Sequence, residues 1–142
     1  MDIVDANVLL SAVNRSDLPH DRSRAWLDTQ LSGGGTVGFP WTCVLAFLRL
    51  ATHPTIFARP LSVSAASTQV EAWLACSTAV PLDPTPTHLP TLVGLLAQAG
   101  VGGNLVNDAH LAALSLEHRA RIISWDSDFA RFPGVRWAHP SP

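Results

Sequence analysis

The stretch IVDANVLL, residues 3–10, is a short apolar run that only Asp5 and Asn7 interrupt. Since the run is apolar on both sides, it predicts a buried strand of a parallel sheet rather than a half-exposed strand. Asp5 would then lie near the carboxyl end of that strand. Ligands bind beyond the carboxyl ends of the strands in open α/β sheets, so this position makes Asp5 a candidate functional residue.

The rest of the chain alternates between predicted strands and predicted helices, with a polar loop at 14–19. Helices are expected from 19 to the glycine run at 33–35, over 42–50, from Ser62 or Ser64 to 74, in the segment that ends at Gly100, and over 105–116. Further strands are expected at 36–39, just after residue 79, at 121–125 and at 135–137. This alternation predicts three α/β/α layers around a central, mostly parallel sheet.

The composition fits one domain and excludes several enzyme mechanisms. The chain has 142 residues, of which 47% are hydrophobic and 14% charged, which is the size of a single domain over residues 1–142. All nine basic residues are Arg. Without Lys there is no Schiff-base chemistry, no Walker A loop and no kinase Lys–Glu pair. Cys43 and Cys76 form no C-x-x-C pattern, which argues against a zinc ribbon and favours two reduced thiols in a cytosolic protein.

Two further acids lie at notable positions. Asp126 directly follows the apolar segment 122–125, so it is expected at the same edge of the sheet as Asp5. Asp108 lies in the first turns of the helix expected over 105–116, at the border of its apolar face. Carboxylates that converge in a cleft repel one another, and a hard divalent cation such as Mg²⁺ or Mn²⁺ relieves that repulsion. A carboxylate-bound Mg²⁺ with open positions suits phosphodiester chemistry.

Each acid also has a simpler explanation. Asp5 could cap a turn, and Asp108 could be an acid that the helix macrodipole favours near the N-terminus. Asp126 and Asp128 could form an Asx turn before Phe129.

Four segments together resemble the PIN-domain ribonucleases, and most closely the VapC toxins of bacterial toxin–antitoxin pairs. They are IVDANVLL (3–10), FLRLATHP (47–54), NLVNDAHLAAL (104–114) and IISWDSDFARFPGVRW (122–137). The resemblance covers essentially the whole chain and implies a single PIN domain. It implies that Asp5, Asp108 and Asp126 are both the catalytic acids and the metal ligands.

The resemblance also assigns supporting residues. Asn7 matches a polar residue that orients the first Asp. Asn107 stands where many relatives have Thr or Ser, and it could hydrogen-bond a ligand carboxylate or a bound water. Asp128 is the second acid of the D-x-D-F ending. Many PIN nucleases carry a Glu where this chain has Ala46 or Phe47, so we expect one firmly bound Mg²⁺, with any second ion held mainly by the RNA phosphate.

The activity that the resemblance implies is endoribonuclease cleavage of structured RNA, a tRNA or rRNA loop, by a metal-activated water. Mg²⁺ would be the cofactor, with Mn²⁺ as a substitute, and the products would carry a 5′-phosphate and a 3′-hydroxyl. The implied partner is a VapB-type antitoxin, bound to a VapC homodimer in a heterotetramer or larger assembly. Arg15, Arg22 and Arg24 cluster in the sequence and are candidate RNA contacts.

Other classes fit the sequence less well. A haloacid-dehalogenase-type phosphatase requires D-x-D and a Lys, whereas this chain has D-A-N and no Lys. A catalytically degenerate PIN scaffold that binds RNA or a protein partner without cleavage stays open, because the Glu is missing. The N-terminus lacks the pattern of a secretory signal and no apolar stretch approaches 18 residues, so we expect no membrane span and a cytoplasmic location.

Overall fold

A computed structural model, which describes residues 1–100 and 102–141, contains one five-stranded sheet with the order β3-β2-β1-β4-β5. Each strand pairs in parallel with its neighbours throughout the described part of the chain. The strands are β1 (Asp2–Val4), β2 (Val37–Pro40), β3 (Ala79–Leu82), β4 (Arg121–Ile123) and β5 (Trp137–Ala138). The predicted α/β class and its mostly parallel sheet are therefore confirmed.

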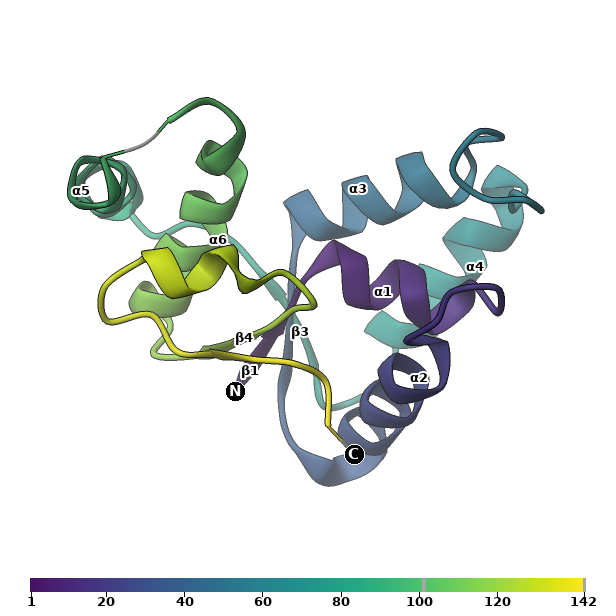
Figure 1. Cartoon of the computed structure of the whole chain (residues 1–142). Coiled ribbons are helices and arrows are strands. Elements are labelled where there is room, and N and C mark those ends of the chain that lie inside the picture. Colours follow the sequence, from purple (N-terminus) through teal and green to yellow (C-terminus); the bar gives the residue numbers. More distant parts are fainter. Residues whose placement is uncertain (101, 142) are drawn as a thin grey trace.

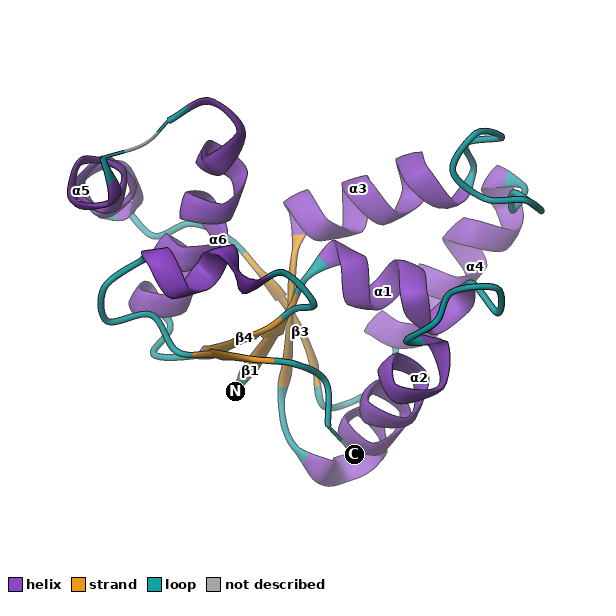
Figure 2. Cartoon of the chain, viewed as in Figure 1, coloured by secondary structure: helices purple, strands orange, loops and turns teal. Residues whose placement is uncertain are grey.

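Helices cover both faces of this sheet (Figures 1 and 2). One face carries α1 (Ala6–Val13), α2 (His20–Thr29), α3 (Trp41–Ala51) and α4 (Val63–Leu74), and the other carries α5 (His88–Ala99) and α6 (Val106–Glu117). A π-helical turn (Gln30–Gly34) extends α2, and short 3₁₀ helices span Gly103–Leu105 and Ser127–Arg131. Within the two described ranges no helix combines the length and hydrophobicity needed to cross a bilayer.

The predicted first strand was too long. β1 ends at Val4, and the apolar run continues as helix α1. Asp5 is the N-cap of that helix, and its Oδ1 accepts a hydrogen bond from the Ala6 backbone N–H at 2.6 Å. Periodicity alone does not distinguish a short buried strand from a short buried helix, because both are apolar all round. Here Val8 and Leu9 are fully buried on a helix that packs against the sheet.

Several predicted helix boundaries agree with the structure. Ser62 is the N-cap of α4, and its Oγ accepts from the Ala65 N–H at 3.0 Å. Gly100 follows α5 with a φ of 65°, the left-handed conformation that favours glycine at a helix end. The helix expected over 42–50 is α3, which begins one residue earlier, directly after Pro40. On α6, Leu114 is fully buried, whereas Leu116 near its end is 38% exposed.

The core lies on both faces of the sheet. Against α3 and α4, the Trp73 ring centroid lies 6.3 Å from that of Phe39 and 5.0 Å from that of Phe47. On the other face α6 turns small residues toward the sheet, and Ala109, Ala112 and Ala113 are fully buried. Small side chains let a helix approach a sheet closely. This close packing holds the first turn of α6, which carries Asp108, near the carboxyl ends of the strands.

Candidate active site

The strand order places the two strand-end acids next to each other. β1 is the central strand: β2 and β3 are added on one side of it, and β4 and β5 on the other, so the strand order reverses at β1. Asp5 follows β1 and Asp126 follows β4 by three residues. The Asp5 N–H donates to the Ile123 carbonyl at 3.0 Å, which joins the ends of the two strands. A crevice at such a switch point is the usual ligand site of open α/β folds.

A hydrogen-bond network holds the Asp5 carboxylate in place. Its Oδ2 accepts from the Ser124 hydroxyl at 2.6 Å and from the Asn7 amide at 3.0 Å. The Ser124 Oγ in turn accepts from the Asn7 amide at 2.9 Å and from the Asp126 N–H at 3.0 Å. The Asn7 Oδ1 accepts from the Trp125 N–H at 3.1 Å. Asn7 thus contacts the Asp5 carboxylate and ties the start of α1 to the exit of β4.

Ser124 is a site residue that the sequence reasoning missed. It is fully buried and contacts both Asp5 and the backbone of Asp126. A hydroxyl among the apolar residues that end a buried strand, in IISWD, was the available signal. Buried polar groups need partners, and a polar residue next to a strand-end acid indicates one.

Three carboxylates form a tight cluster beside Asp5. Side-chain oxygens of Asp108, Asp126 and Asp128 lie within 4.8 Å of one another. Asp126 also makes the expected Asx turn, because its Oδ1 accepts from the Asp128 N–H at 2.8 Å. Asp128 in addition pairs with Arg131 at 3.2 Å. The structure therefore places Asp128 inside the acid cluster.

The acids share a strained electrostatic environment. Burial, followed by the negative charges of Asp126, Asp5 and Asp128, raises the pKa of Asp108 to about 6. Burial also raises the pKa of Asp5, against the opposing hydrogen bonds from Ser124 and Ala6. Bringing these groups together in ionised form costs free energy in the absence of a cation. The donors are all oxygens, which is the set that Mg²⁺ or Mn²⁺ prefers, so the residues fit a hard divalent cation.

A pocket of about 420 Å³ opens onto this centre and is lined by Asp5 and Asp108, by the exposed Asn107, and by part of α3. Ala46 lines it, whereas Phe47 is fully buried in the core against Trp73. Of the two positions where a further Glu was sought, only Ala46 therefore faces the acids. Arg49 also lines the pocket from α3.

Cys43 lies under the acid site. Its Sγ is 3.9 Å from the Asp5 Oδ1, and only 3% of the residue is exposed. Burial, followed by the nearby Asp5 charge, raises the pKa of the thiol well above its ordinary value. Cys43 is thus protonated at neutral pH and donates to Asp5.

The three candidate RNA-contacting arginines separate in the structure. Arg15 and Arg24 line one pocket, which is not the acid pocket. Arg22 lies instead over the Trp125 ring, 4.9 Å from its centroid, and donates to the Pro140 carbonyl at 3.0 Å. In the structure Arg22 therefore ties α2 to the C-terminal segment.

Comparison with known proteins agrees with this geometry. The sequence model of the PIN domain matches residues 3–135. Ribonuclease VapC37 of Mycobacterium tuberculosis is 57% identical over 140 residues, which cover 99% of this chain and 97% of the relative. The chain belongs to the VapC family of PIN domains. Ribonuclease VapC31 of the same organism is 40% identical and is also matched over nearly its full length, 99% of each chain.

Solved structures share the fold of this VapC-family chain at much lower identity. VapBC2 from Rickettsia felis, solved with a DNA fragment from its promoter, has a TM-score of 0.71 at 15% identity and covers 97% of both chains. VapC20 of Mycobacterium tuberculosis, described as a sarcin–ricin loop cleaving toxin, has a TM-score of 0.69 at 16% identity and covers 96% of this chain and 99% of its own. The PIN-like α/β/α arrangement expected from the sequence is thereby confirmed.

Proposed function

We propose that this VapC-family chain is a Mg²⁺-dependent endoribonuclease toxin. The observation that carries the proposal is the convergence of Asp5, Asp108, Asp126 and Asp128 at the switch point of the sheet, with oxygens of the last three within 4.8 Å. The names of the relatives, all ribonucleases, support it. Mn²⁺ is the expected substitute, because it takes the same oxygen ligands.

Asp5, Asp108 and Asp126 would hold the metal ion, with Asp128 as an additional acid at its side. A bound Mg²⁺ lowers the pKa of a coordinated water and neutralises charge on the phosphoryl group. Asp126 would position the attacking water or accept its proton. Ser124 and Asn7 hold Asp5 in one orientation, which fixes the site before RNA arrives. In-line attack that breaks the bond from phosphorus to the 3′-oxygen leaves a 5′-phosphate and a 3′-hydroxyl.

The substrate we propose is a loop of a structured RNA, either a tRNA or an rRNA. VapC20, which shares the fold, is described as cleaving the sarcin–ricin loop, and this supports a loop substrate. Sequencing of RNA 5′-phosphate ends after brief induction of the toxin would identify the cut. A single dominant site in a tRNA or rRNA loop is expected, and cuts spread over mRNA would contradict this substrate class.

The proposed partner is a VapB-type antitoxin in the cytoplasm, bound to a VapC homodimer. Solved structures with the same fold include VapBC complexes, which supports such pairing. Coexpression with the antitoxin should suppress toxicity and yield a complex of a heterotetramer or larger size. Toxicity that persists with an antitoxin bound would count against neutralisation.

A second candidate function is a PIN scaffold that binds RNA or a protein partner without cleaving it. One observation favours it, namely that the α3 position facing the acids is Ala46, without a carboxylate. Cleavage of purified total RNA that requires Mg²⁺ and stops with EDTA would exclude this candidate.

The deciding experiment compares variants of the proposed metal ligands with a matched surface acid. Asp5→Ala and Asp108→Asn should reduce cleavage of total RNA by at least about 100-fold, since electrostatic stabilisation is usually the largest single contribution to catalysis. Asp17→Asn, at an exposed loop position, should cleave like the parent protein. Parent-like cleavage by Asp5→Ala would show that the site assignment is wrong.

A further inference from the structure

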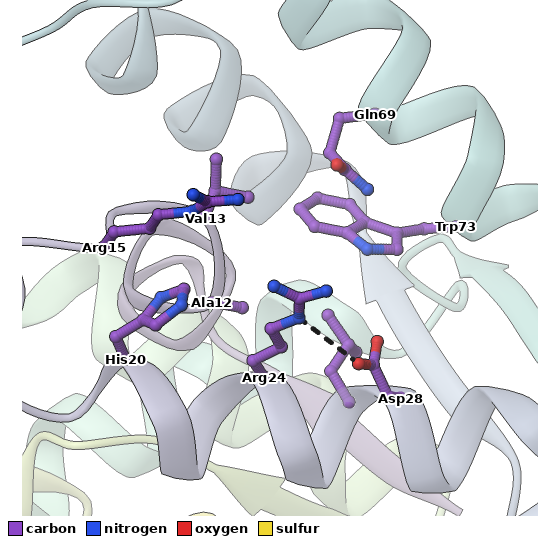
Figure 3. Close-up of a pocket in the computed structure, with 9 residues that line it drawn as sticks. Ala12, Val13, Arg15, His20, Arg24, Asp28, Gln69 and Trp73 are labelled. Carbon is purple, nitrogen blue, oxygen red and sulfur yellow. Dashed lines mark ion pairs between the residues drawn. The ribbon is translucent and has the colours of Figure 1, made fainter.

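Two pockets lie on the α1–α2–α4 side of the molecule and share one arginine. The first, of about 370 Å³, is lined by Arg15 together with His20, Arg24, Gln69 and Trp73. Figure 3 shows Arg24 rising from α2 and Gln69 and Trp73 reaching from α4 toward the same space. The second, of about 330 Å³, is lined by Arg15, Asn14, Ser16 and Arg59. Each volume corresponds to about ten water molecules at roughly 30 Å³ each, which leaves room for a phosphate group.

The charges in these pockets are available to a ligand. Across residues 1–100 and 102–141, the structure shows neither a hydrogen bond nor an ion pair for the side chains of Arg15 and Arg59. Arg24 has only an exposed contact with Asp28, with Nε 3.5 Å from Oδ2, and exposed pairs of this kind contribute little. Among the described residues that line these pockets, Asp28 is the one acid, against three arginines.

Other arginines of the chain are engaged within it. Arg121 donates two hydrogen bonds to Asp2, at 2.7 and 3.0 Å, and Arg131 pairs with Asp128. Arg22 contacts Trp125 and the Pro140 carbonyl. The joined pockets thus gather cations that the fold does not use, which is the arrangement that recognises successive negative charges on a polymer.

Helix α1 sets the spacing between these pockets and the acids. Asp5 caps its first residue, and Val13, its last, lines both pockets. Eight residues at about 1.5 Å each give a length of about 12 Å. An RNA strand with its scissile phosphate at the acids could therefore place a backbone phosphate at the far end of α1.

We propose that Arg15, Arg24 and Arg59 form a subsite for backbone phosphates of the substrate RNA, at the end of α1 about 12 Å from the acids. This inference rests on the proposed ribonuclease function. Arg15 lies between the two pockets and would contact adjacent phosphates, because a guanidinium group binds phosphate oxygens through two parallel N–H donors. The Gln69 amide adds a neutral donor in the first pocket. The subsite selects for a continuous strand rather than for particular bases, since phosphate contacts carry no sequence information directly.

The test measures how binding depends on salt. A single-stranded RNA of about 20 nucleotides is titrated into Asp108→Asn protein, which should not cut it, over a series of salt concentrations. Each lost phosphate contact should make the negative slope of log K against log[salt] less steep by about 0.7, which is about a fourfold loss of affinity at roughly 0.15 M salt. Adding Arg15→Gln and Arg59→Gln together should therefore make the slope less steep by about 1.4.

Arg119→Gln is the matched control. Arg119 is exposed and lies before β4, at the end of the sheet away from the acids. The Arg119→Gln substitution removes one positive charge, as Arg15→Gln and Arg59→Gln each do, yet its slope should equal that of the Asp108→Asn background. A slope unchanged by Arg15→Gln with Arg59→Gln, or a slope that Arg119→Gln makes less steep by as much as each of these substitutions, would overturn the subsite.

Asp28→Asn provides a test in the opposite direction. It removes the one acid of the pockets and releases Arg24, so RNA should bind about fourfold more tightly at roughly 0.15 M salt. Weaker RNA binding by Asp28→Asn would overturn the subsite. The subsite would also be overturned if the protein with Arg15→Gln and Arg59→Gln lost antitoxin binding but kept its RNA binding. Cleavage by the parent chain is measured separately. If Arg15→Gln and Arg59→Gln change the salt dependence of RNA binding but the parent does not cleave RNA, only the proposed nuclease activity is refuted. If the parent cleaves RNA but these substitutions leave the salt dependence unchanged, only the subsite is refuted.

Discussion

Asp5 caps helix α1 with one carboxylate oxygen and faces the acid site with the other. Oδ1 accepts from the Ala6 N–H, while Oδ2 accepts from Ser124 and Asn7. The simpler explanation from the sequence, a capping Asp, and the functional explanation therefore describe the same side chain. Loss of cleavage in Asp5→Ala can therefore reflect either role, whereas Asp108 is not the N-cap of α6 and Asp108→Asn tests the acid site without removing a helix cap.

Asp108→Asn should stabilise the metal-free protein while it abolishes cleavage. The folded protein holds the pKa of Asp108 at about 6, above the ordinary value of 3.8, so the fold binds this proton more tightly than the unfolded chain does. The stability from this proton is fully present below about pH 4 and is lost as the pH rises through about 6. At pH 7.5 the variant should unfold with a free energy about 1 kcal/mol larger, after allowance for solvent screening.

Urea unfolding in EDTA at pH 4 and pH 7.5 measures this difference. The gain should be present at pH 7.5 and nearly absent at pH 4. A variant that is less stable than the parent at pH 7.5 would contradict the electrostatic account of the site.

Ser124→Ala should reduce both activity and stability. It removes the donor to Asp5 and the acceptor of the Asp126 N–H, and it leaves these partners partly buried without that contact. Such a loss costs about 1–3 kcal/mol. Unfolding and cleavage assays would be run beside Ser127→Ala, an exposed neighbour that should behave like the parent. Equal behaviour of the two variants would show that the network does not orient Asp5.

At the scale of helices, α5 is held to α6 by a buried polar chain. Glu117 on α6, with 3% of its side chain exposed, pairs with Nδ1 of His88 on α5 at 3.0 Å. Nε2 of His88 and Nδ1 of His110 share a hydrogen bond at 2.8 Å. Burial opposes ionisation of Glu117, yet the hydrogen bonds from His88 and Thr85 hold its pKa below the ordinary value. Burial and the neighbouring His88 lower the pKa of His110.

His88→Ala should loosen α5 from the rest of the molecule. It removes the His88 ring nitrogen that contacts Glu117 and leaves the buried carboxylate with the Thr85 N–H, at 3.4 Å, as its remaining partner within residues 1–100 and 102–141, at a cost of about 1–3 kcal/mol. Thermal unfolding and amide exchange of α5 measure the effect. The control is His53→Ala at an exposed position, whose free energy of unfolding should lie within about 0.5 kcal/mol of that of the parent. Parent-like exchange in α5 would show that the apolar contacts alone fix this helix.

The hydrogen-bonded side chains of Glu117, His88 and His110 also predict how α5 responds to acid. The lowered pKa of Glu117 and of His110 means that the unfolded chain takes up their protons more readily. The stability that His110 contributes is therefore complete above the ordinary His pKa of 6.5 and is lost as the pH falls below it. The stability that Glu117 contributes is lost as the pH falls further, below the ordinary Glu pKa of 4.5. Amide exchange of α5, corrected for its intrinsic pH dependence, should show less protection at pH 5 than at pH 7.5. Equal protection would contradict this.

For the whole molecule, Mg²⁺ should stabilise the fold. A ligand that binds only the folded state adds RT ln(1 + [L]/Kd), about 2.7 kcal/mol when its concentration is 100 times Kd. The melting temperature of the parent should rise with Mg²⁺ concentration, and that of Asp17→Asn should rise equally. Asp108→Asn should respond much less because a metal-binding oxygen and its charge are lost. An equal rise in Asp108→Asn would place Mg²⁺ outside the acid cluster.

Much of the fold followed from local pattern. Strands β2, β3 and β4 and helices α2 to α6 were predicted within a few residues, because Gly and Pro mark their ends and apolar residues recur along them. Helix α1 was not predicted, since its eight mainly apolar residues directly continue a buried strand and are too few to distinguish a helix from a strand. β5 lies at Trp137–Ala138, slightly beyond the predicted segment.

The sequence by itself determined that acids follow two buried strands, Asp5 after the first and Asp126 after a late one, and that Asp108 opens a helix. Parallel strands turn their carboxyl ends to one edge, so local position was enough to predict that these groups converge. Only the tertiary structure decided that Ser124 supports Asp5, that Ala46 faces the acids and that Arg15 and Arg59 line one pocket. These contacts join segments far apart along the chain, and their geometry depends on how helices pack on the sheet, which residue spacing does not encode.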